Sequence, residues 1–277
     1  MNKSVKGTKA KRVEIRAMRD NPSIVRHKFA RRKPLKVAEA LARDIVDYIV
    51  NEDLEEGTRL PPEREMLADT GRARSTLREA LRLLETRGVV EIRQGIAGGP
   101  VVRRPRPADL GEALTLILLF EGSSMLDIIE AREEMEVLSV RRAGPKMNKH
   151  ELEALQISIN KQLDNIENLD VFLFETRRFH AIINQAAGSR VLGVLNEALQ
   201  MTTHVSIREI EYSLPHRRNV AKWHQRILDA IKAGDYDGAC AAMRQHVVES
   251  GKYWRERAGT MASRPVRWLP NSERQDR

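Results

Sequence analysis

Apolar side chains recur every three or four residues along most of the chain, which predicts a protein built mainly of amphipathic helices. The first apolar stripe consists of Val37, Leu41, Ile45, Tyr48 and Ile49. A short polar helix is expected over 63–69 and a third helix over 74–87, followed by two short strands over 89–93 and 100–102. This order of three helices and a two-stranded ribbon predicts a winged helix-turn-helix over residues 35–104.

Helical spacing dominates again from Asp109 onward, and no long strand pattern is visible there. The expected helices span 109–121, 124–143, 148–166, 169–187, 189–212, 216–233 and 235–257. They predict an all-helical bundle over 109–258, followed by a loose C-terminal tail over 259–277. Prolines favour a linker over 105–108, because they oppose a continued helix. The fold class is mainly α: an N-terminal winged helix-turn-helix with a small wing, and a C-terminal helical bundle.

Charge is concentrated at the N-terminus. The chain of 277 residues has a net charge of +9, and residues 1–34 hold twelve of its 48 Lys and Arg but only two of its 39 Asp and Glu. This segment has few large apolar residues, so we expect a disordered basic tail. It would suit a polyanion such as DNA phosphate, or it is a solvated extension with no specific partner.

Composition excludes several classes of protein. A single cysteine rules out a disulfide framework and a cysteine-rich metal site. No apolar run approaches the roughly 18 residues of a membrane helix, and the lysine-studded N-terminus has no apolar core behind it. We therefore expect a cytoplasmic, nucleoid-associated protein with no membrane partner.

The expected helix over 74–87 carries the chemistry of major-groove recognition. Arg74 and Arg78 are four residues apart and so share one outward face, while Leu77 faces inward. Arginine there can pair with guanine or hold phosphate, and hydroxyl residues near the helix start favour phosphate. The other candidate contacts are Ser75 and Thr76 on the helix and Arg93, Gln94 and Gly95 at the wing tip.

These residues lie in a stretch that resembles the GntR family of transcription regulators. The resemblance is carried by Leu60-Pro-Pro-Glu-Arg-Glu-Met-Leu-Ala68, Gly71-Arg-Ala-Arg-Ser-Thr-Leu-Arg-Glu-Ala-Leu81 and Leu84-Glu-Thr-Arg-Gly-Val-Val-Glu91. It implies a homodimer that binds a short palindromic operator of double-stranded DNA. Carried over by position, the implied DNA contacts are Arg64, Arg74, Ser75, Arg78 and Gly95. Ala73 departs from the family, which usually has a Ser or Thr helix cap there.

Three histidines are placed to meet inside the helical bundle. His224 precedes the turn at Gly234 by ten residues and His246 follows it by twelve, so the two rings are level across a helical hairpin. His180 lies on another helix. Three imidazoles from three helices could form a facial metal site with open positions, or they are separate histidines without a shared ligand.

Residues 109–255 resemble the FCD effector domain of the FadR subgroup of GntR regulators. The marks are Asp127-Ile-Ile-Glu-Ala-Arg-Glu-Glu-Met-Glu136, Arg178-Phe-His-Ala-Ile182 and His224-Gln-Arg-Ile-Leu-Asp-Ala-Ile-Lys-Ala-Gly-Asp235 with Met243-Arg-Gln-His246. Many members hold a divalent metal through one Asp and three His, which His180, His224 and His246 match. Thr176 stands where the Asp is usual, and Glu175 points elsewhere around the helix. A three-histidine site for one zinc-like transition metal and a metal-free ligand pocket both remain open.

Arg132 lies on an apolar stripe, where a charge is costly unless it is paired. It either pairs with Glu136 one turn on or clamps the carboxylate of an effector, as the resemblance implies, and we favour the effector role. Asn184 and His204 are weaker candidates for the effector pocket.

The sequence thus predicts a ligand-responsive transcription regulator, not an enzyme, with no catalytic residues. We expect a repressor that responds to a small carboxylate-bearing or acyl metabolite, although the position of the operator in the promoter decides between repression and activation. One alternative is a metal-dependent hydrolase using His180, His224 and His246 with Glu175 or Glu136 as base, which no known catalytic motif supports. The other is a non-specific architectural DNA-binding protein.

Overall fold

The computed structural model describes residues 35–95, 98–207, 212–258 and Val266. The expected basic tail over 1–34 and most of the C-terminal tail over 259–277 lie outside this part of the chain. Val266 is buried, and its backbone N–H donates to the carbonyl of Ser123 over 3.1 Å. The prediction of a loose tail is therefore wrong at this residue.

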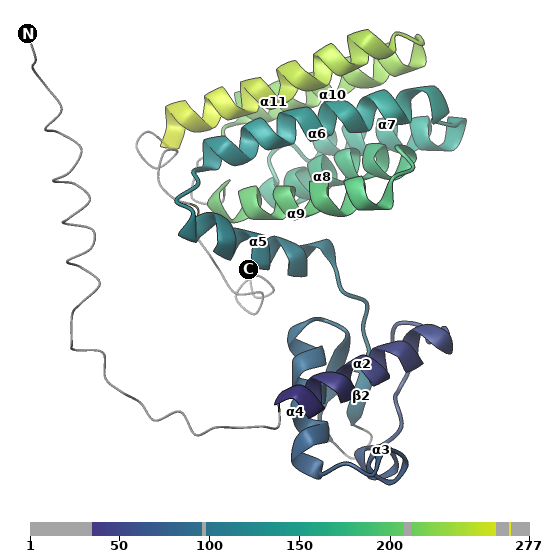
Figure 1. The fold of residues 1–277 in the computed structure, drawn as a ribbon. Helices are drawn as coiled ribbons and strands as arrows, with labels where there is room; N and C mark the ends of the chain where they lie inside the picture. The colour runs from purple at the N-terminus through teal and green to yellow at the C-terminus, as the bar shows by residue number, and fades with distance from the viewer. Residues whose placement is uncertain (1–34, 96–97, 208–211, 259–265, 267–277) are drawn as a thin grey trace, which may run out of the picture. The chain divides into compact units, whose positions relative to one another are not determined.

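Contacts divide the chain into two units, one of Met1–Asp53 with Pro61–Leu83 and one of Leu54–Leu60 with Leu84–Arg277. Within the described residues, the first unit contains helices close to the N-terminal end of that part of the chain (Figure 1). These are α2 (Leu35–Asn51), α3 (Glu63–Thr70) and most of α4 (Arg74–Thr86). Gly71 ends α3 in a left-handed conformation with φ 61°, which glycine adopts without strain.

The predicted apolar stripe on α2 is narrower in the structure. Leu41, Ile45 and Ile49 are buried, but Val37 and Tyr48 are exposed. The inner face of α2 is completed by Ala38 and Ala42 instead, and α4 buries Leu77, Ala80 and Leu81. Small alanines allow helices to approach closely, and helical spacing alone does not show whether such residues lie inward.

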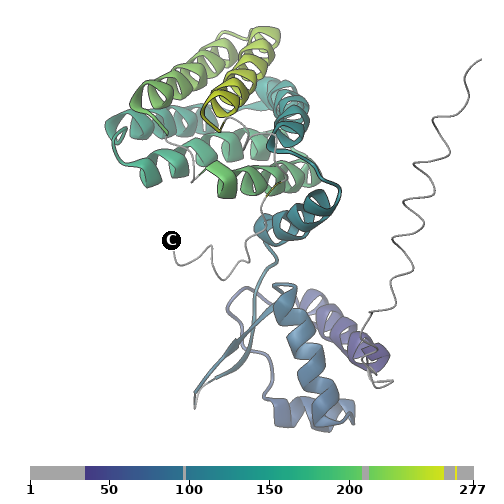
Figure 2. The ribbon, with the colours of Figure 1, turned by 90° about the vertical axis from the view of Figure 1, so that its left-hand side faces the viewer.

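The second unit includes the wing, a two-stranded antiparallel sheet (Figure 2). Strand β1 (Val90–Arg93) pairs with β2 (Gly99–Val102) so that Val90 faces Val102 and Arg93 faces Gly99. Arg59 adds an isolated bridge to Val101. The structure thus confirms the predicted ribbon, in which Arg93 and Gly99 are the last paired residues before the connecting loop.

The helical bundle follows the wing. Its helices are α5 (Pro107–Phe120), α6 (Met125–Ala143), α7 (Lys149–Asp164), α8 (Leu169–Ala186), α9 (Arg190–Ile207), α10 (Leu214–Lys232) and α11 (Tyr236–Ala258), with the single turn η1 (Gly144–Lys146) between α6 and α7. Helix α6 packs against α8, α9 and α11, and α10 packs against α11 and α7 (Figure 1). The core between them is aromatic and aliphatic, with Phe172, Phe179, Ile227, Leu228 and Met243 fully buried. None of the described helices is long and apolar enough to cross a membrane.

Two prolines predicted as breaks stand inside first helical turns. Pro107 is the first residue of α5, so the helix starts within the expected linker over 105–108. Pro215 is the second residue of α10. Two residues further on, the N–H of Arg217 donates to the carbonyl of Ser213, the residue that precedes the helix. Proline is well suited to the first turn because its missing N–H would find no helical partner there. A third boundary is also wrong, because α9 ends at Ile207 and Tyr212 is not helical.

Candidate DNA-binding surface and buried histidine site

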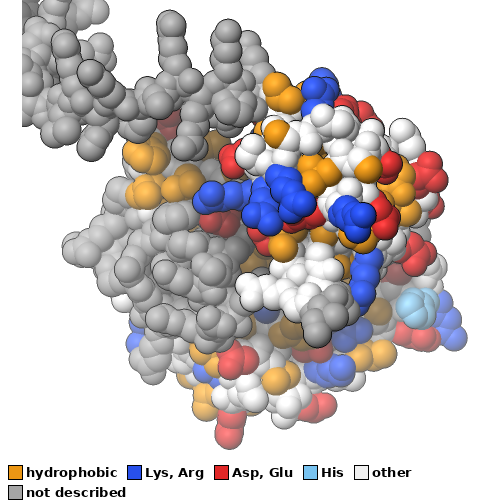
Figure 3. Space-filling view, turned by 90° about the horizontal axis from the view of Figure 1, so that it is seen from below, with side chains coloured by type: hydrophobic (Ala, Val, Ile, Leu, Met, Phe, Trp, Pro, Cys, Tyr) orange, Lys and Arg blue, Asp and Glu red, His pale blue; other side chains and the backbone are white. Residues whose placement is uncertain are grey.

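The first two turns of α4 present polar side chains above a buried apolar face. Arg74, Ser75 and Arg78 are exposed, Thr76 is half-buried, and Leu77 is fully buried. Residues four apart lie on one side of a helix, so both guanidinium groups share the outer face. In the space-filling view from below, several Lys and Arg side chains gather on the side turned to the viewer (Figure 3).

Arg78 has one exposed partner. Its Nε donates to Oε2 of Glu63 over 3.3 Å, while 69% of the Arg78 side chain stays accessible. Exposed ion pairs contribute little to stability, so Glu63 does not prevent Arg78 from binding an external anion. Arg64 is exposed as well, one residue further along α3.

The backbone at the start of α4 is regular despite Ala73. The N–H groups of Thr76 and Leu77 donate to the Ala73 carbonyl over 2.9 and 3.1 Å. The alanine therefore removes a side-chain cap without changing where the helix begins.

The described part of the wing tip is polar and exposed. Arg93 donates to Oε2 of Glu91 over 3.2 Å, and 52% of its side chain is accessible. Gln94 and Gly95 are exposed, and Gly95 has φ 102°, a conformation that favours glycine. The next two loop residues, 96–97, lie outside the described chain.

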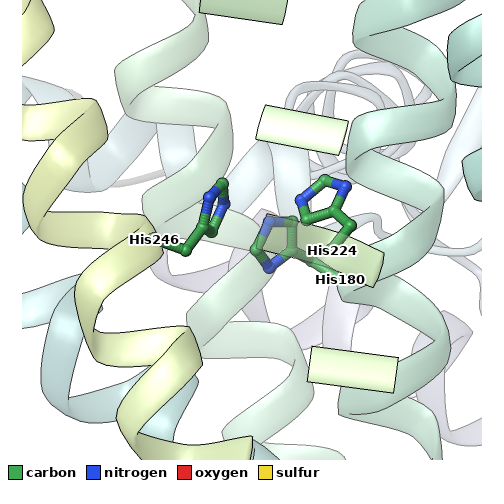
Figure 4. Close-up of side chains that lie close together, drawn as sticks. All are labelled: His180, His224 and His246. Atoms are coloured by element: carbon green, nitrogen blue, oxygen red, sulfur yellow. The ribbon is translucent and has the colours of Figure 1, made fainter. Parts of the chain in front are cut away.

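His180, His224 and His246 come together in the bundle interior (Figure 4). They are contributed by α8, α10 and α11, and one ring nitrogen from each lies within 4.8 Å of the others. All three are buried, at 2%, 0% and 5% exposure. The expectation that His224 and His246 are level across the helical hairpin is confirmed.

Neighbouring side chains orient two of the rings. Nδ1 of His180 lies 3.0 Å from Oε2 of Glu136, and Nδ1 of His224 lies 2.9 Å from Oε1 of Gln162. Both oxygens accept, so both Nδ1 atoms donate and the Nε2 lone pairs are free for a ligand. Metal-binding histidines usually donate their second ring N–H to such an oxygen, which fixes the tautomer and the orientation of the ring.

Burial keeps two of the three rings neutral. Burial, followed by the neighbouring histidines, lowers the pKa of His224 and of His246 well below the usual value. Nε2 of His224 and Nδ1 of His246 are buried without a hydrogen-bond partner among the described residues. Imidazoles that converge from three helices, two of them with an unpartnered ring nitrogen in the described structure, fit a divalent transition metal.

The residue in the usual carboxylate position does not supply a charge. Thr176 lies one turn before His180, and its Oγ1 is buried without a partner in the described structure. Glu175 is buried but directed elsewhere, with Lys161 and Arg178 at 3.7 and 3.5 Å from its Oε1. The prediction that Glu175 points away from the histidines is therefore confirmed.

Arg132 forms an ion pair with Glu136, which was one of the two roles expected for it. Its Nη2 donates to Oε1 of Glu136 over 3.2 Å, and 11% of its side chain is accessible. Glu136 also accepts from Gln200 over 2.7 Å, so three side chains share one buried carboxylate. Burial alone would raise the pKa of Glu136, but its interactions with His180, Arg132 and Gln200 outweigh burial and lower that pKa to about 2.

A cavity of about 60 Å³ adjoins the histidines. Its polar lining includes Arg132, Thr176, Arg177, His180, Gln200, Thr203, Tyr212, His246 and Ser250, and its apolar lining includes Ile129, Leu173, Val220, Val247 and Trp254. Pairing with Glu136 thus leaves Arg132 at the cavity wall, where its Nε is buried without a partner in the described structure. A small molecule with an acidic group matches this lining better than a long apolar one.

The two remaining effector candidates are not found in the cavity lining of the described structure. Asn184 is buried and accepts from Asn196 over 2.8 Å, but it does not line the cavity. The side chain of His204 lies outside the described part of the structure. Sequence reasoning missed Gln200, Thr203 and Tyr212, because single polar residues carry no spacing signal.

A fourth buried histidine lies apart from the cluster. His216 stacks on Tyr253 with ring centroids 3.6 Å apart, and its Nε2 has no partner among the described residues. Burial, with a smaller contribution from Arg257, lowers the pKa of His216 to about 4. This ring is therefore neutral at physiological pH.

Both halves of the chain match known families. Residues 37–98 match the family described as bacterial regulatory proteins, gntR family, and residues 127–249 match the FCD domain. An uncharacterized HTH-type transcriptional regulator of Bacillus subtilis strain 168, YcbG, is 30% identical over 218 residues, which are 76% of this chain and 88% of that protein. The chain therefore belongs to the GntR family of bacterial regulators.

Within that family it is a DNA-binding transcription regulator with an FCD effector-binding domain, not an enzyme. A relative of Escherichia coli strain K12, provisionally named as the regulatory protein of the L-lactate dehydrogenase operon, is 29% identical over 77% of this chain and 84% of its own length. The structure of a GntR protein from Streptococcus agalactiae shares the fold. Its TM-score is 0.59 at 23% identity, covering 77% of this chain and 98% of that one.

Proposed function

We propose that α4 enters the major groove of an operator and reads it with Arg74 and Arg78. The observation that carries this proposal is the pair of exposed guanidinium groups one turn apart over fully buried Leu77. Ser75 and Thr76 lie at the helix start, where free N–H groups favour phosphate. Arg64 on α3 and Arg93, Gln94 and Gly95 on the wing complete the proposed contacts.

The regulator binds a palindromic operator as a homodimer in this proposal, because two recognition helices then enter successive grooves. Ile117 and Phe120 on α5 are 60% and 88% exposed, which is apolar surface of the kind that a subunit contact covers. The basic segment 1–34 adds contacts to phosphate that do not depend on sequence. Its target is chromosomal DNA, which places the protein in the cytoplasm at the nucleoid.

The proposed effector is a small carboxylate that binds in the cavity against Arg132. A volume of about 60 Å³ is far below the roughly 300–1,000 Å³ of drug-sized pockets, which favours a metabolite of a few heavy atoms over a long acyl chain. The Escherichia coli relative is named for an L-lactate dehydrogenase operon, and lactate has this size and charge. We propose repression that the effector relieves by favouring a dimer geometry with low operator affinity.

One divalent metal, such as zinc, is the proposed cofactor, held by His180, His224 and His246. When bound, it would attract and orient an oxygen of the effector. Glu136 and Gln162 keep two of the rings in the tautomer that leaves Nε2 free.

The DNA proposal is tested by selecting binding sites from a random duplex library with the purified full chain. We expect a palindromic consensus, with specific binding roughly 10³-fold or more above binding to unrelated DNA. Equal recovery of all sequences would contradict the proposal and support a non-specific architectural protein instead.

The effector proposal is tested by thermal shift with a panel of small carboxylic acids, with and without a chelator. We expect stabilisation of the wild type by at least one acid and none of the Arg132→Met variant. Circular dichroism of the variant is the control for folding. An acid that stabilises both proteins equally would show that Arg132 is not its anchor.

A further inference from the structure

A second hollow, of about 280 Å³, lies in the helical bundle where α8 and α9 meet the start of α5. We call it the outer pocket. It shares Arg177 and Gln200 with the cavity of about 60 Å³ beside the histidines, but none of the three histidines is among the described residues that line it. The outer pocket is therefore a separate hollow, and its larger volume admits a larger molecule.

The walls of the outer pocket are one face of α8 and one face of α9, whose lining residues recur at helical spacing. They include Phe174, Arg177, Arg178 and Ala181 on α8, and Glu197 and Gln200 on α9. Helix α9 packs against both α8 and α5 (Figure 1). Arg106, the residue directly before α5, adds a third arginine to the lining.

The three arginines give the outer pocket its chemistry. One Nη of Arg106 lies 3.5 Å from Glu56, and one Nη of Arg178 lies 3.5 Å from Glu175. A guanidinium has five N–H groups, so these single contacts leave further donors on both side chains, which are 60% and 39% accessible. Arg177 is half-buried on the same wall. Three positive charges around one hollow repel one another, and an anion between them relieves that repulsion.

A phosphate monoester matches this lining better than a carboxylate. It carries a charge of about −1.5 to −2 at pH 7 and three acceptor oxygens, one for each guanidinium. Arginine also binds phosphate through two parallel N–H bonds, which adds strength and a fixed geometry.

The other lining residues indicate what the phosphate is attached to. Phe174 is 56% exposed and offers an apolar surface to a carbon skeleton. Glu197 is half-buried, and burial raises the pKa of its carboxyl group. A ligand hydroxyl that donates to Glu197 would restore part of the solvation that this carboxylate has lost.

We propose that the outer pocket is a second effector site, which binds a phosphate monoester with a small, hydroxyl-bearing carbon skeleton. The phosphate lies between Arg106, Arg177 and Arg178, and a hydroxyl bonds to Glu197. Because Arg106 belongs to the segment between β2 and α5, a bound ester links this segment to α8 and can thereby change operator affinity. DNA phosphate is the competing occupant, but a hollow between helices favours a small molecule over a duplex.

Isothermal titration calorimetry with the full chain tests the proposal. The probes are glucose-6-phosphate, glycerol-3-phosphate, inorganic phosphate, glucose and a DNA duplex unrelated to the operator. We expect at least one of the two esters to bind roughly tenfold or more tightly than inorganic phosphate, because it also contacts the walls. Glucose should not bind, because it lacks the charge.

Two variants assign the binding to the outer pocket. Arg106→Gln and Arg178→Gln change residues that line this pocket but not the cavity beside the histidines, and each should weaken ester binding roughly tenfold or more. Arg218→Gln is the matched control at an exposed arginine of α10, and it should bind the ester as the wild type does. Circular dichroism checks folding, and the exposed position of Arg106 makes its variant the decisive one.

The proposal is overturned if neither ester binds, if both bind no more tightly than inorganic phosphate, or if ester affinity is unchanged in Arg106→Gln. Duplex binding that Arg106→Gln weakens, without any ester binding, would assign the arginines to DNA phosphate instead.

Fluorescence anisotropy at constant ionic strength then compares operator affinity with and without the ester. We expect a change of roughly fivefold or more in the wild type and little change in Arg106→Gln. A bound ester that leaves operator affinity unchanged would overturn the effector role. Calorimetry does not involve the operator, so it decides ester binding even if the proposed operator recognition fails.

Discussion

The outer face of α4 and the interior of the helical bundle both use cationic or basic side chains, but burial gives them opposite properties. Arg74 and Arg78 are exposed, and the one ion pair found for Arg78 is itself exposed. In the bundle, Arg132 is held by a fully buried Glu136, and His224 is kept neutral. The exposed groups keep a charge available for an outside partner, while the buried groups are fixed by their neighbours.

This difference separates the effects of mutation. If Arg74 and Arg78 contact DNA as proposed, truncating either removes binding energy for DNA and leaves the fold nearly unchanged. Changing a buried polar group lowers stability first, because its partners are left buried with fewer hydrogen bonds or without a counter-charge. The following expectations, from the largest effect to the smallest, test whether that separation holds.

Glu136→Gln should have the largest effect on folding. It leaves the Arg132 guanidinium buried without a counter-charge, and breaking a buried pair costs roughly 3–5 kcal/mol. Urea unfolding followed by circular dichroism measures the change. Glu134→Gln is the control on the same helix, because Glu134 is 71% exposed and pairs with Arg244 at the surface. Similar losses in both variants would contradict the importance of burial.

His216 should make stability depend on pH. Its pKa is about 4 in the folded chain and near 6.5 when unfolded, so between these values the unfolded state binds more protons. The free energy of unfolding therefore has its full value from this group above pH 6.5. It falls by roughly 3 kcal/mol as the pH is lowered from 6.5 to 4. Urea unfolding of the wild type and of His216→Phe, which can still stack on Tyr253, is compared at several pH values. A difference between the two proteins that does not change with pH would count against this.

Arg74→Ala and Arg78→Ala should each weaken operator binding by roughly 10- to 100-fold, the cost of one bidentate contact to a base. Fluorescence anisotropy with the selected operator measures this, and urea unfolding should show little change. Arg218→Ala, at an exposed arginine on α10, removes the same charge outside the DNA-binding region. Equal losses in all three variants would point to net charge as the cause.

Arg93→Ala should have the smallest effect. If Arg93 contacts only phosphate, its loss weakens binding to all sequences alike and lowers the salt dependence by about one unit of slope. Anisotropy titrations over a range of salt concentrations, on operator and unrelated DNA, measure this. Loss of affinity for the operator alone would instead assign Arg93 to base contact.

The sequence predicted the fold well where a single local pattern decides it. Helical spacing located all seven bundle helices, and the valines around the wing loop predicted both strands. Prolines misled the boundaries at residues 107 and 215, because proline ends one helix but also begins another. The meeting of His224 and His246 was predictable because the Gly234 turn fixes their distance along two adjacent helices.

The rest of the candidate site depends on contacts between distant parts of the chain. Gln162 supports His224 across 62 positions, and Gln200 supports Glu136 across 64. No periodicity relates such residues, so neither was predicted as part of the site. Arg132 shows the other limit. The sequence left a structural and a binding role as alternatives, but in the structure Arg132 both pairs with Glu136 and lines the cavity.

The shared carboxylate of Glu136 also constrains how this regulator can change its specificity. One oxygen accepts from Arg132 and Gln200, and the other faces His180. If Arg132 anchors the effector as proposed, a substitution that adapts this arginine to a new acid also disturbs the carboxylate that orients His180, so the energetic effects of changes at the two positions do not add. A change of effector specificity would then require paired substitutions around Glu136 rather than single replacements.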